Sequence, residues 1–303
     1  MIKFTEMCKM SQKQLKDYMQ KYLISNNYEV VSKDGFLYAK GTTPVLLVAH
    51  LDTVHKNLPG EIVQHNSKIS SPQGIGGDDR CGVFIIASIV KDMHCSVLLC
   101  EDEEAGMVGA KKFAATQFIQ ELDVNYMIEF DRKGENDAVF YSCDNADFID
   151  FVTDCTGYKE AFGTFSDIST LMPASKLCGV NLSCGYYNPH TVNEYVMYDE
   201  MLSTVSAAKA LIAEECERFD YVAKKYSYTP YQSYYYSNTK KKRNIVSLIK
   251  DDTYLELEVV AEDAEGTEFT VYALGDTKAE CWLELFLNNP SMCMNDIKDY
   301  NFS

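Results

Sequence analysis

The sequence has no apolar run long enough to cross a bilayer, and its first residues, MIKFTEMCKMSQKQ, lack the charged and then apolar order of a signal peptide. It also has no C-x-x-C pair, so its 11 cysteines are expected to be reduced and mostly buried, without a catalytic role. Basic residues are few, 28 against 45 acidic ones, and the net charge of −17 argues against a nucleic-acid or anionic-membrane partner. We therefore expect a cytoplasmic protein whose clustered carboxylates can hold cations.

The order of apolar patterns along the chain predicts the fold class. The runs PVLLVAHLDTV, SVLLC and NYMIEFD are typical of strands buried on both faces, and they alternate with helical patterns. This alternation predicts an α/β fold with a mixed, mostly parallel sheet sandwiched by helices. Helical periodicity also predicts a first helix within residues 5–26 and a long last helix over residues 199–221.

A change of composition follows the last of these helices. Six tyrosines crowd residues 226–236, and a basic run follows at residues 240–243. We predict a catalytic domain at residues 1–222, a Tyr-rich and basic linker at 223–243, and a small α+β subdomain at 244–303. In that subdomain TYLELEVVAED and EFTVYALGD are predicted strands and TKAECWLELFLNN a predicted helix. The tyrosines either pack the subdomain or contact substrate.

Residues able to carry chemistry follow the ends of the predicted strands. His50 and Asp52 share one face after VLLVA, EDEE at residues 101–104 follows SVLLC, and Asp131 follows YMIEF. Each has an ordinary interpretation, as a core histidine, helix-capping acids or a turn. In open α/β sheets, however, ligands bind at the carboxyl ends of strands.

Two further segments complete the set. Asp78 and Asp79 lie in GIGGDDRCG, residues 74–82, which alone would be interpreted as a turn with an aspartate cap before a helix. His190 lies in YYNPHTVNEYV and alone would be a loop histidine. The three remaining histidines, His55, His65 and His94, are predicted to be surface or packing residues.

In this order, H-x-D, G-x-D-D-x-x-G, E-E with a following G-x-x-G, a strand-end D and a late H, the sequence resembles the co-catalytic zinc exopeptidases. The resemblance covers about residues 40–220. DDRCGV and EEAGMVGA are most similar to the glutamyl aminopeptidases, whereas FSDISTLM and CGYYNPHTVNEYV are more similar to the peptidase T and carboxypeptidase G type.

The resemblance implies a site for two divalent metal ions, whose ligands are His50, Asp78, Glu104, Asp131 and His190. Asp78 would bridge the two ions, and the peptide bond that follows it would be cis. Glu103 would be the general base and Asp52 the partner of His50. Nitrogen and oxygen ligands without thiolate suit zinc, cobalt or manganese, and zinc is the first expectation.

The spacing departs from both branches of that superfamily. Only 59 positions separate Asp131 from His190 (190 − 131), which leaves no room for the lid domain of one branch. His50 and Asp78 are 28 positions apart (78 − 50), which leaves room only for a hairpin in place of the insert of the other. Substrate specificity and oligomeric state are therefore not inherited from either branch.

The sequence thus predicts a dinuclear metal-dependent hydrolase that cleaves amide bonds of peptides, an aminopeptidase or small-peptide exopeptidase. One alternative is an N-acyl amino acid deacylase, which would use the same metals and the same Glu103 on an N-acyl small molecule. Another is a non-catalytic metal-binding regulatory protein. Glu103 and Asp52 argue against the last alternative, because neither is needed merely to hold metal.

Overall fold

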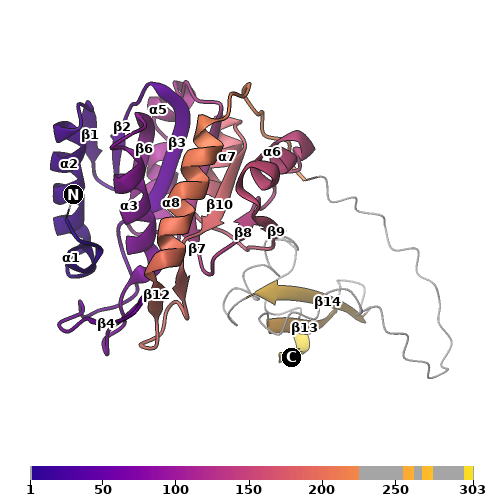
Figure 1. Cartoon of the computed structure of the whole chain (residues 1–303). Helices are drawn as coiled ribbons and strands as arrows, with labels where there is room; N and C mark the ends of the chain where they lie inside the picture. The colour runs from indigo at the N-terminus through magenta and orange to yellow at the C-terminus, as the bar shows by residue number, and fades with distance from the viewer. Residues whose placement is uncertain (1, 225–254, 263–267, 276–296, 303) are drawn as a thin grey trace. The chain divides into compact units, whose positions relative to one another are not determined.

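A computed structural model describes residues 2–224, 255–262, 268–275 and 297–302 (Figure 1). The chain divides into two compact units, Met1–Lys225 and Tyr226–Ser303. The first unit contains an eight-stranded sheet and a four-stranded sheet, and the second contains a three-stranded sheet. All predicted site residues belong to the first unit.

The large sheet is mixed, as predicted, and its order is β1-β2-β6-β3-β7-β10-β8-β9. Its strands are β1 (Val30–Lys33), β2 (Phe36–Ala39), β3 (Thr43–His50), β6 (Cys95–Cys100), β7 (Tyr126–Arg132), β8 (Asp137–Val139), β9 (Lys159–Ala161) and β10 (Gly179–Ser183). The central strands β6, β3, β7 and β10 run parallel, whereas β2 and β8 pair antiparallel with β6 and β10. Parallel strands end at the same edge, so the residues after β3, β6 and β7 gather there.

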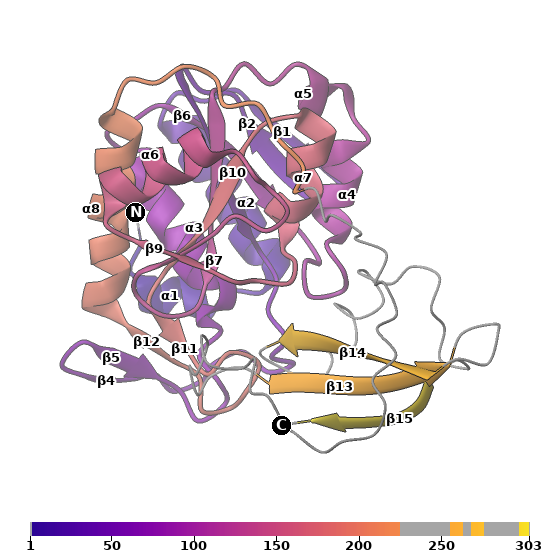
Figure 2. The same ribbon diagram turned by 90° about the vertical axis from the view of Figure 1, so that its right-hand side faces the viewer.

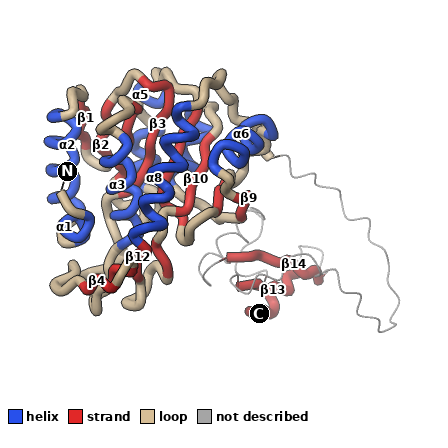
Figure 3. Tube along the Cα trace, viewed as in Figure 1, coloured by secondary structure: helices blue, strands red, loops and turns tan. Residues whose placement is uncertain are grey.

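Helices cover both faces of this sheet, which confirms the predicted sandwich (Figures 2 and 3). They are α1 (Phe4–Cys8), α2 (Gln12–Ser25), α3 (Gly77–Ile89), α4 (Val108–Ala114), α5 (Gln117–Gln120), α6 (Ala146–Thr156), α7 (Asp167–Ser175) and α8 (Tyr198–Ala213). On one face α3 packs on β3 and β7 and contacts α8; on the other, α7 packs on β3, β7 and β10 beside α4 and α5. No helix in the described part of the chain is long and apolar enough to cross a membrane.

The central strands are buried on both faces, which explains why apolar and polar residues do not alternate along them. Every residue of β6 and the last six residues of β3 are buried, because helices cover both faces. The helix α3 is buried along almost its whole length, in agreement with its apolar sequence FIIASI.

A small antiparallel sheet lies beside the large one and has the order β11-β12-β5-β4. Its strands are β4 (Val63–His65), β5 (Lys68–Ser70), β11 (Tyr186–Tyr187) and β12 (Tyr195–Met197). Because β5 pairs with β12, the hairpin between the predicted ligands His50 and Asp78 lies next to the segment that carries His190. The segment between His50 and Asp78 therefore contains the predicted hairpin, formed by β4 and β5.

Two predicted helices differ from the observed ones. The helix expected within residues 5–26 is divided into α1 and α2, because Ser11 accepts a hydrogen bond from Gln14 N and the Gln14 side chain accepts one from Ser11 N, a capping box that starts a new helix. The last helix ends at Ala213 and not near residue 221. Beyond it the backbone hydrogen-bonds to other segments, for example Phe219 N to Asn125 O, which replaces helical hydrogen bonds.

In the second unit β13 (Leu255–Glu262) lies between β14 (Glu268–Gly275) and β15 (Ile297–Phe302), and both neighbours are antiparallel to it. The strands β13 and β14 match the predicted strand pair, whereas β15 was not predicted. The predicted helix at residues 277–289, the tyrosine cluster and the basic run lie outside the described residues. The predicted domain boundaries stay predictions.

Candidate active site

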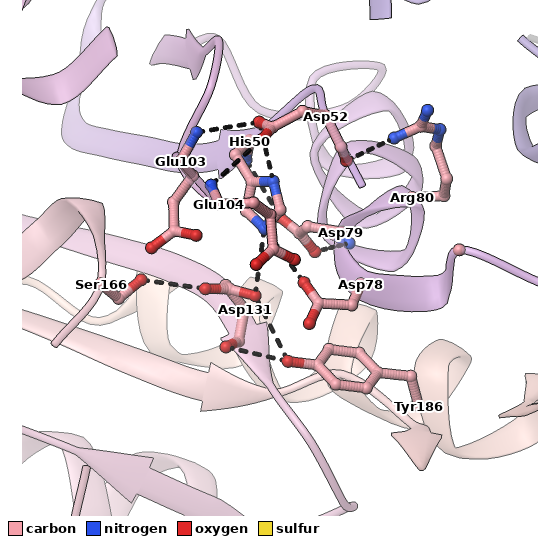
Figure 4. A network of polar contacts seen from close by, with 12 residues as sticks. His50, Asp52, Asp78, Asp79, Arg80, Glu103, Glu104, Asp131, Ser166 and Tyr186 are labelled. Atoms are coloured by element: carbon pink, nitrogen blue, oxygen red, sulfur yellow. Dashed lines mark hydrogen bonds and ion pairs between the residues drawn. The ribbon is translucent and has the colours of Figure 1, made fainter. Parts of the chain in front are cut away.

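The predicted site residues lie together at the carboxyl edge of the large sheet, and Figure 4 labels all of them except His190. His50 is the last residue of β3, Asp131 is on β7, and Glu103 and Glu104 follow β6. Asp78 stands at the start of α3, and His190 lies between β11 and β12. The topology of parallel strands, completed by one helix start and one loop, therefore brings together residues from five segments.

The Asp78 carboxylate lies between the two histidines. Its Oδ1 is 3.0 Å from His50 Nε2, and its Oδ2 is 3.2 Å from His190 Nε2. The side chain is almost buried, and the Asp78–Asp79 peptide bond is cis, as the family resemblance implies. One oxygen therefore faces each histidine, the arrangement that a bridging carboxylate requires.

Each histidine also faces a second carboxylate. Asp131 Oδ1 lies 3.5 Å from His50 Nε2, and Glu104 Oε1 lies 3.2 Å from His190 Nε2. Among the described residues the buried Glu104 Oε1 has no partner other than this contact with His190, so the oxygen and the ring nitrogen face a common point. Two sets of one imidazole nitrogen and two carboxylate oxygens result. These residues fit a pair of divalent cations such as zinc.

Asp79 is also close to His50 and Asp131, with ligand atoms within 4.8 Å. Its two oxygens, however, accept hydrogen bonds from His50 N at 3.1 Å and from Gly82 N at 2.8 Å. Burial and the neighbouring Asp131 raise the pKa of Asp79 well above its usual range. Asp79 therefore joins the end of β3 to the start of α3, and Asp78 is the better candidate ligand.

Asp52 holds His50 and the backbone of Glu103 and Glu104 in place. Its carboxylate contacts His50 Nδ1 at 3.2 Å and accepts hydrogen bonds from Glu103 N and Glu104 N, both at 3.0 Å. A carboxylate on the second ring nitrogen orients a ligand histidine and directs Nε2 into the site. Burial tends to raise the pKa of Asp52, but the contact with His50 outweighs burial and lowers it. The buried Arg80, which sequence reasoning missed, holds this turn by donating to Leu51 O and Asp52 O.

Glu103 lies at the same centre. One of its carboxylate oxygens is within 4.8 Å of ligand atoms of His50 and Glu104, and Figure 4 shows the carboxylate pointing toward Asp131 and Ser166. Burial raises the pKa of Glu103 to about 10 against the opposing effect of His50. Without cations this buried group therefore favours its neutral form, and nearby positive charge would restore the carboxylate.

The acids of the site in turn raise the pKa values of the two histidines. Hydrogen bonding to Asp78 and Glu104 raises the pKa of His190 to about 11. Burial tends to lower the pKa of His50, but Asp131, Asp52 and Asp78 outweigh burial and raise it well above its usual range. In the metal-free protein the neighbouring carboxylates therefore favour the protonated form of both histidines.

Sequence reasoning missed several residues that hold the ligands in place. Ser166 Oγ donates to Asp131 Oδ2 at 2.9 Å, and Tyr186 Oη donates to Asp131 Oδ1 at 3.3 Å. Glu194 accepts from Asp78 N and contacts His55, so of the two predicted roles, surface or packing, His55 has the packing one. Glu194 was visible as an acid four positions after His190, but nothing in the sequence marks it as buried.

The sequence matches no protein-family model and no curated protein. The structure, in contrast, is similar to aminopeptidase PepT from Bacillus cereus, with a TM-score of 0.59 and 14% identity over 69% of this chain and 96% of that chain. It is also similar to a tripeptidase from Staphylococcus aureus, with a TM-score of 0.57 and 12% identity over 69% of this chain and 95% of that chain.

An aminopeptidase from the archaeon Desulfurococcus kamchatkensis is similar too, with a TM-score of 0.54 and 14% identity over 70% of this chain and 95% of that chain. This chain has the fold of these peptidases. At such identities the likeness establishes the fold alone, and the chemistry has to be argued from the site.

Proposed function

We propose that this protein is a dinuclear metal-dependent hydrolase that cleaves amide bonds of small peptides, as an aminopeptidase or related exopeptidase. The observation that carries the proposal is the Asp78 carboxylate, which presents one oxygen to His50 and the other to His190. Three carboxylates, those of Asp78, Asp131 and Glu104, face the two histidines at one point and bring negative charge together there. Two cations would offset that negative charge.

The proposed ligand sets are His50, Asp131 and Asp78 for one cation, and His190, Glu104 and Asp78 for the other. When bound, two such cations polarise a scissile carbonyl and lower the pKa of a shared water. The donor types favour zinc, with cobalt or manganese as alternatives. Asp52 keeps the His50 ring oriented, and Ser166 and Tyr186 fix the two oxygens of Asp131.

Glu103 is the proposed general base. Its backbone N–H is held by Asp52, which fixes the position from which the side chain extends. Its carboxylate accepts the proton of the attacking water and delivers it to the departing amine. The free carboxylate needed for the first step is the form that the positive charge of two cations favours over the neutral acid.

We further propose that no separate lid domain is inserted between Asp131 and His190. The intervening residues form β8, α6, β9, α7, β10 and β11, which all belong to the two sheets and their covering helices.

Replacement of Glu103 by glutamine tests the catalytic role. We expect Glu103→Gln to keep two metals per chain and to lose peptidase activity by orders of magnitude, because glutamine cannot accept the proton. Asp102→Asn is the matched control, since Asp102 lies on the same turn but contacts Gln12. Equal peptidase activity of Glu103→Gln and wild type would exclude Glu103 as the general base, whereas metal binding without peptidase activity in either protein would favour the non-catalytic alternative.

The substrate class is tested with peptides of one sequence in free, N-blocked and C-blocked forms, together with metal analysis. An aminopeptidase cleaves the free and C-blocked forms. Cleavage of the N-blocked form alone would favour the N-acyl amino acid deacylase. Fewer than two metals per chain in a fully active sample, or activity insensitive to chelators, would contradict the dinuclear centre.

A further inference from the structure

We propose that His55 and Glu194 form a positioning pair that fixes the backbone of Asp78 relative to the His190 loop. The inference rests on the function proposed above, because it concerns how the bridging carboxylate is held. Neither residue is placed in the two ligand sets, and His55 was predicted only to be a surface or packing residue.

The pair is buried and its hydrogen bonds are short. Glu194 Oε1 accepts from Asp78 N at 2.9 Å, while Oε2 accepts from Gly76 N at 2.8 Å and lies 2.7 Å from His55 Nε2. The Glu194 side chain is 0% exposed and the His55 side chain 9% exposed. A carboxylate oxygen only accepts hydrogen bonds, so we assign the hydrogen of this contact to Nε2 of His55.

The contacts join three segments that are distant in sequence. His55 follows β3, Gly76 and Asp78 begin α3, and Glu194 stands between His190 and β12. Glu194 N also donates to Thr191 O, so Glu194 and the residue next to His190 belong to one turn. One carboxylate therefore sets the distance between the loop that carries His190 and the turn that carries Asp78.

The glycines of GIGGDDRCG make room for this pair. Gly74 has φ +87°, and a Cβ there would lie 2.1 Å from His55 Cε1. A Cβ on Gly77 would lie 2.6 Å from Val196 Cγ2 and 3.3 Å from Glu194 Oε1. Because these glycines have no side chain, the His55 imidazole can pack against the turn at Gly74. For the same reason β12, the strand that follows Glu194, can pack against it at Gly77.

Loss of the imidazole would leave a buried carboxylate oxygen with one donor fewer and would open space beside Gly74. The Glu194 side chain would then hold Gly76 and Asp78 less firmly, and Asp78 would no longer be fixed at the spacing that serves both histidines. Partners behind metal ligands typically change metal affinity about 10–100-fold when they are removed.

The test compares His55→Ala with His55→Gln in the full chain and measures Zn²⁺ affinity by competition with a chromogenic chelator. We expect His55→Ala to weaken Zn²⁺ binding about 10–100-fold. We expect His55→Gln to recover most of the loss, because its amide supplies a donor. His65→Ala is the control, since His65 is exposed on β4. The visible spectrum of the Co²⁺-loaded protein reports the ligand geometry and should change only in His55→Ala.

A purely structural pair would give a different result. His55→Ala would then lower the melting temperature of the metal-free protein and leave Zn²⁺ affinity and the Co²⁺ spectrum unchanged, which would overturn the inference. If His55→Ala does not fold, Glu194→Gln carries the same comparison, because one of its oxygens is replaced by a donor. Failure of the wild-type chain to bind two metals would contradict the proposed function itself, so the two failures are distinguishable.

Discussion

Asp78 and Asp79 are neighbours in the chain, but their carboxylates have different partners. Asp78 faces two imidazoles, and Asp79 accepts from two backbone N–H groups. Their pKa values move in opposite directions: that of Asp78 is lowered because His190 and His50 outweigh burial, and that of Asp79 is raised by burial. Contacts, and not residue type, therefore separate a candidate ligand from a structural acid.

The two asparagine variants should differ accordingly. We expect Asp78→Asn to lose both metals, because an amide offers one uncharged oxygen where two charged ones are needed. Asp79→Asn resembles the neutral acid, so it should keep two metals and lose about 1–3 kcal/mol of stability from one backbone N–H left without an acceptor. Metal analysis and urea unfolding measure both effects, and equal metal loss in the two variants would contradict the assignment.

The stability of the metal-free protein should fall as pH rises. The pKa values of His50 and His190 are raised on folding, so their stabilisation is full below about pH 6.5 and is lost toward the folded pKa, about 11 for His190. The raised pKa of Glu103, about 10, acts in the same direction, because the unfolded chain ionises this group near pH 4.3.

We therefore expect the melting temperature with chelator present to decrease from about pH 6 to about pH 9. With zinc present it should not decrease, because metal binding requires deprotonated histidines and is favoured by higher pH. Circular dichroism melting curves in the two conditions make the comparison. A metal-free melting temperature that rises over this range would show that the buried centre is not charged as described.

At the scale of elements, the segment between Ala213 and Lys224 is fastened by side chains as well as by backbone. Asn145 accepts from Phe148 N as the N-cap of α6, and its amide donates to Asp220 O. One residue therefore caps a helix and ties down the segment that leaves the first unit.

Asn145→Ala should lower stability by about 1–2 kcal/mol, because the cap is lost together with the tie to Asp220. Asn145→Asp keeps the cap acceptor and loses only the donor, so its stability should lie between those of alanine and wild type. Urea unfolding measures the series. Zinc stoichiometry should stay at that of wild type in both variants, since Asn145 is absent from the proposed ligand sets.

The sequence was sufficient for features that depend on local pattern. Buried strands were visible as apolar runs, and the residues at their ends converge because parallel strands share an edge. The end of α8 was not predictable, since residues 216–224 leave helical geometry to pair with distant backbone such as Asn125 and Lys176. Arg80, Ser166 and Glu194 were missed for the same reason, because only tertiary packing makes them buried partners of the site.

At the scale of the whole molecule, every residue of the candidate site belongs to the unit Met1–Lys225. This unit contains the described core, both sheets beside the site and all eight helices named above. Nothing among the ligands comes from the second unit, whose described part is the sheet β14-β13-β15.

We therefore expect the chain cut after residue 225 to unfold cooperatively and to bind two zinc ions per molecule. Calorimetry and metal analysis test this expectation. A peptidase assay on the same sample decides the role of the tyrosines at 226–236: kcat/KM equal to that of the full chain would exclude substrate contacts by them. Failure of the cut chain to bind metal would place part of the centre in the second unit.

The candidate ligands are spread along the chain, and this has a consequence for biosynthesis. His50 and His190 are 140 positions apart (190 − 50), and β5 cannot pair with β12 until the chain has been made past residue 197. At about 5–20 residues per second, translation takes about 7–30 s to pass from the first histidine to the second. The first proposed ligand set is complete only after Asp131 has been made, and the second only after His190. The proposed two-metal site therefore cannot form before residue 190 of the 303 has been translated.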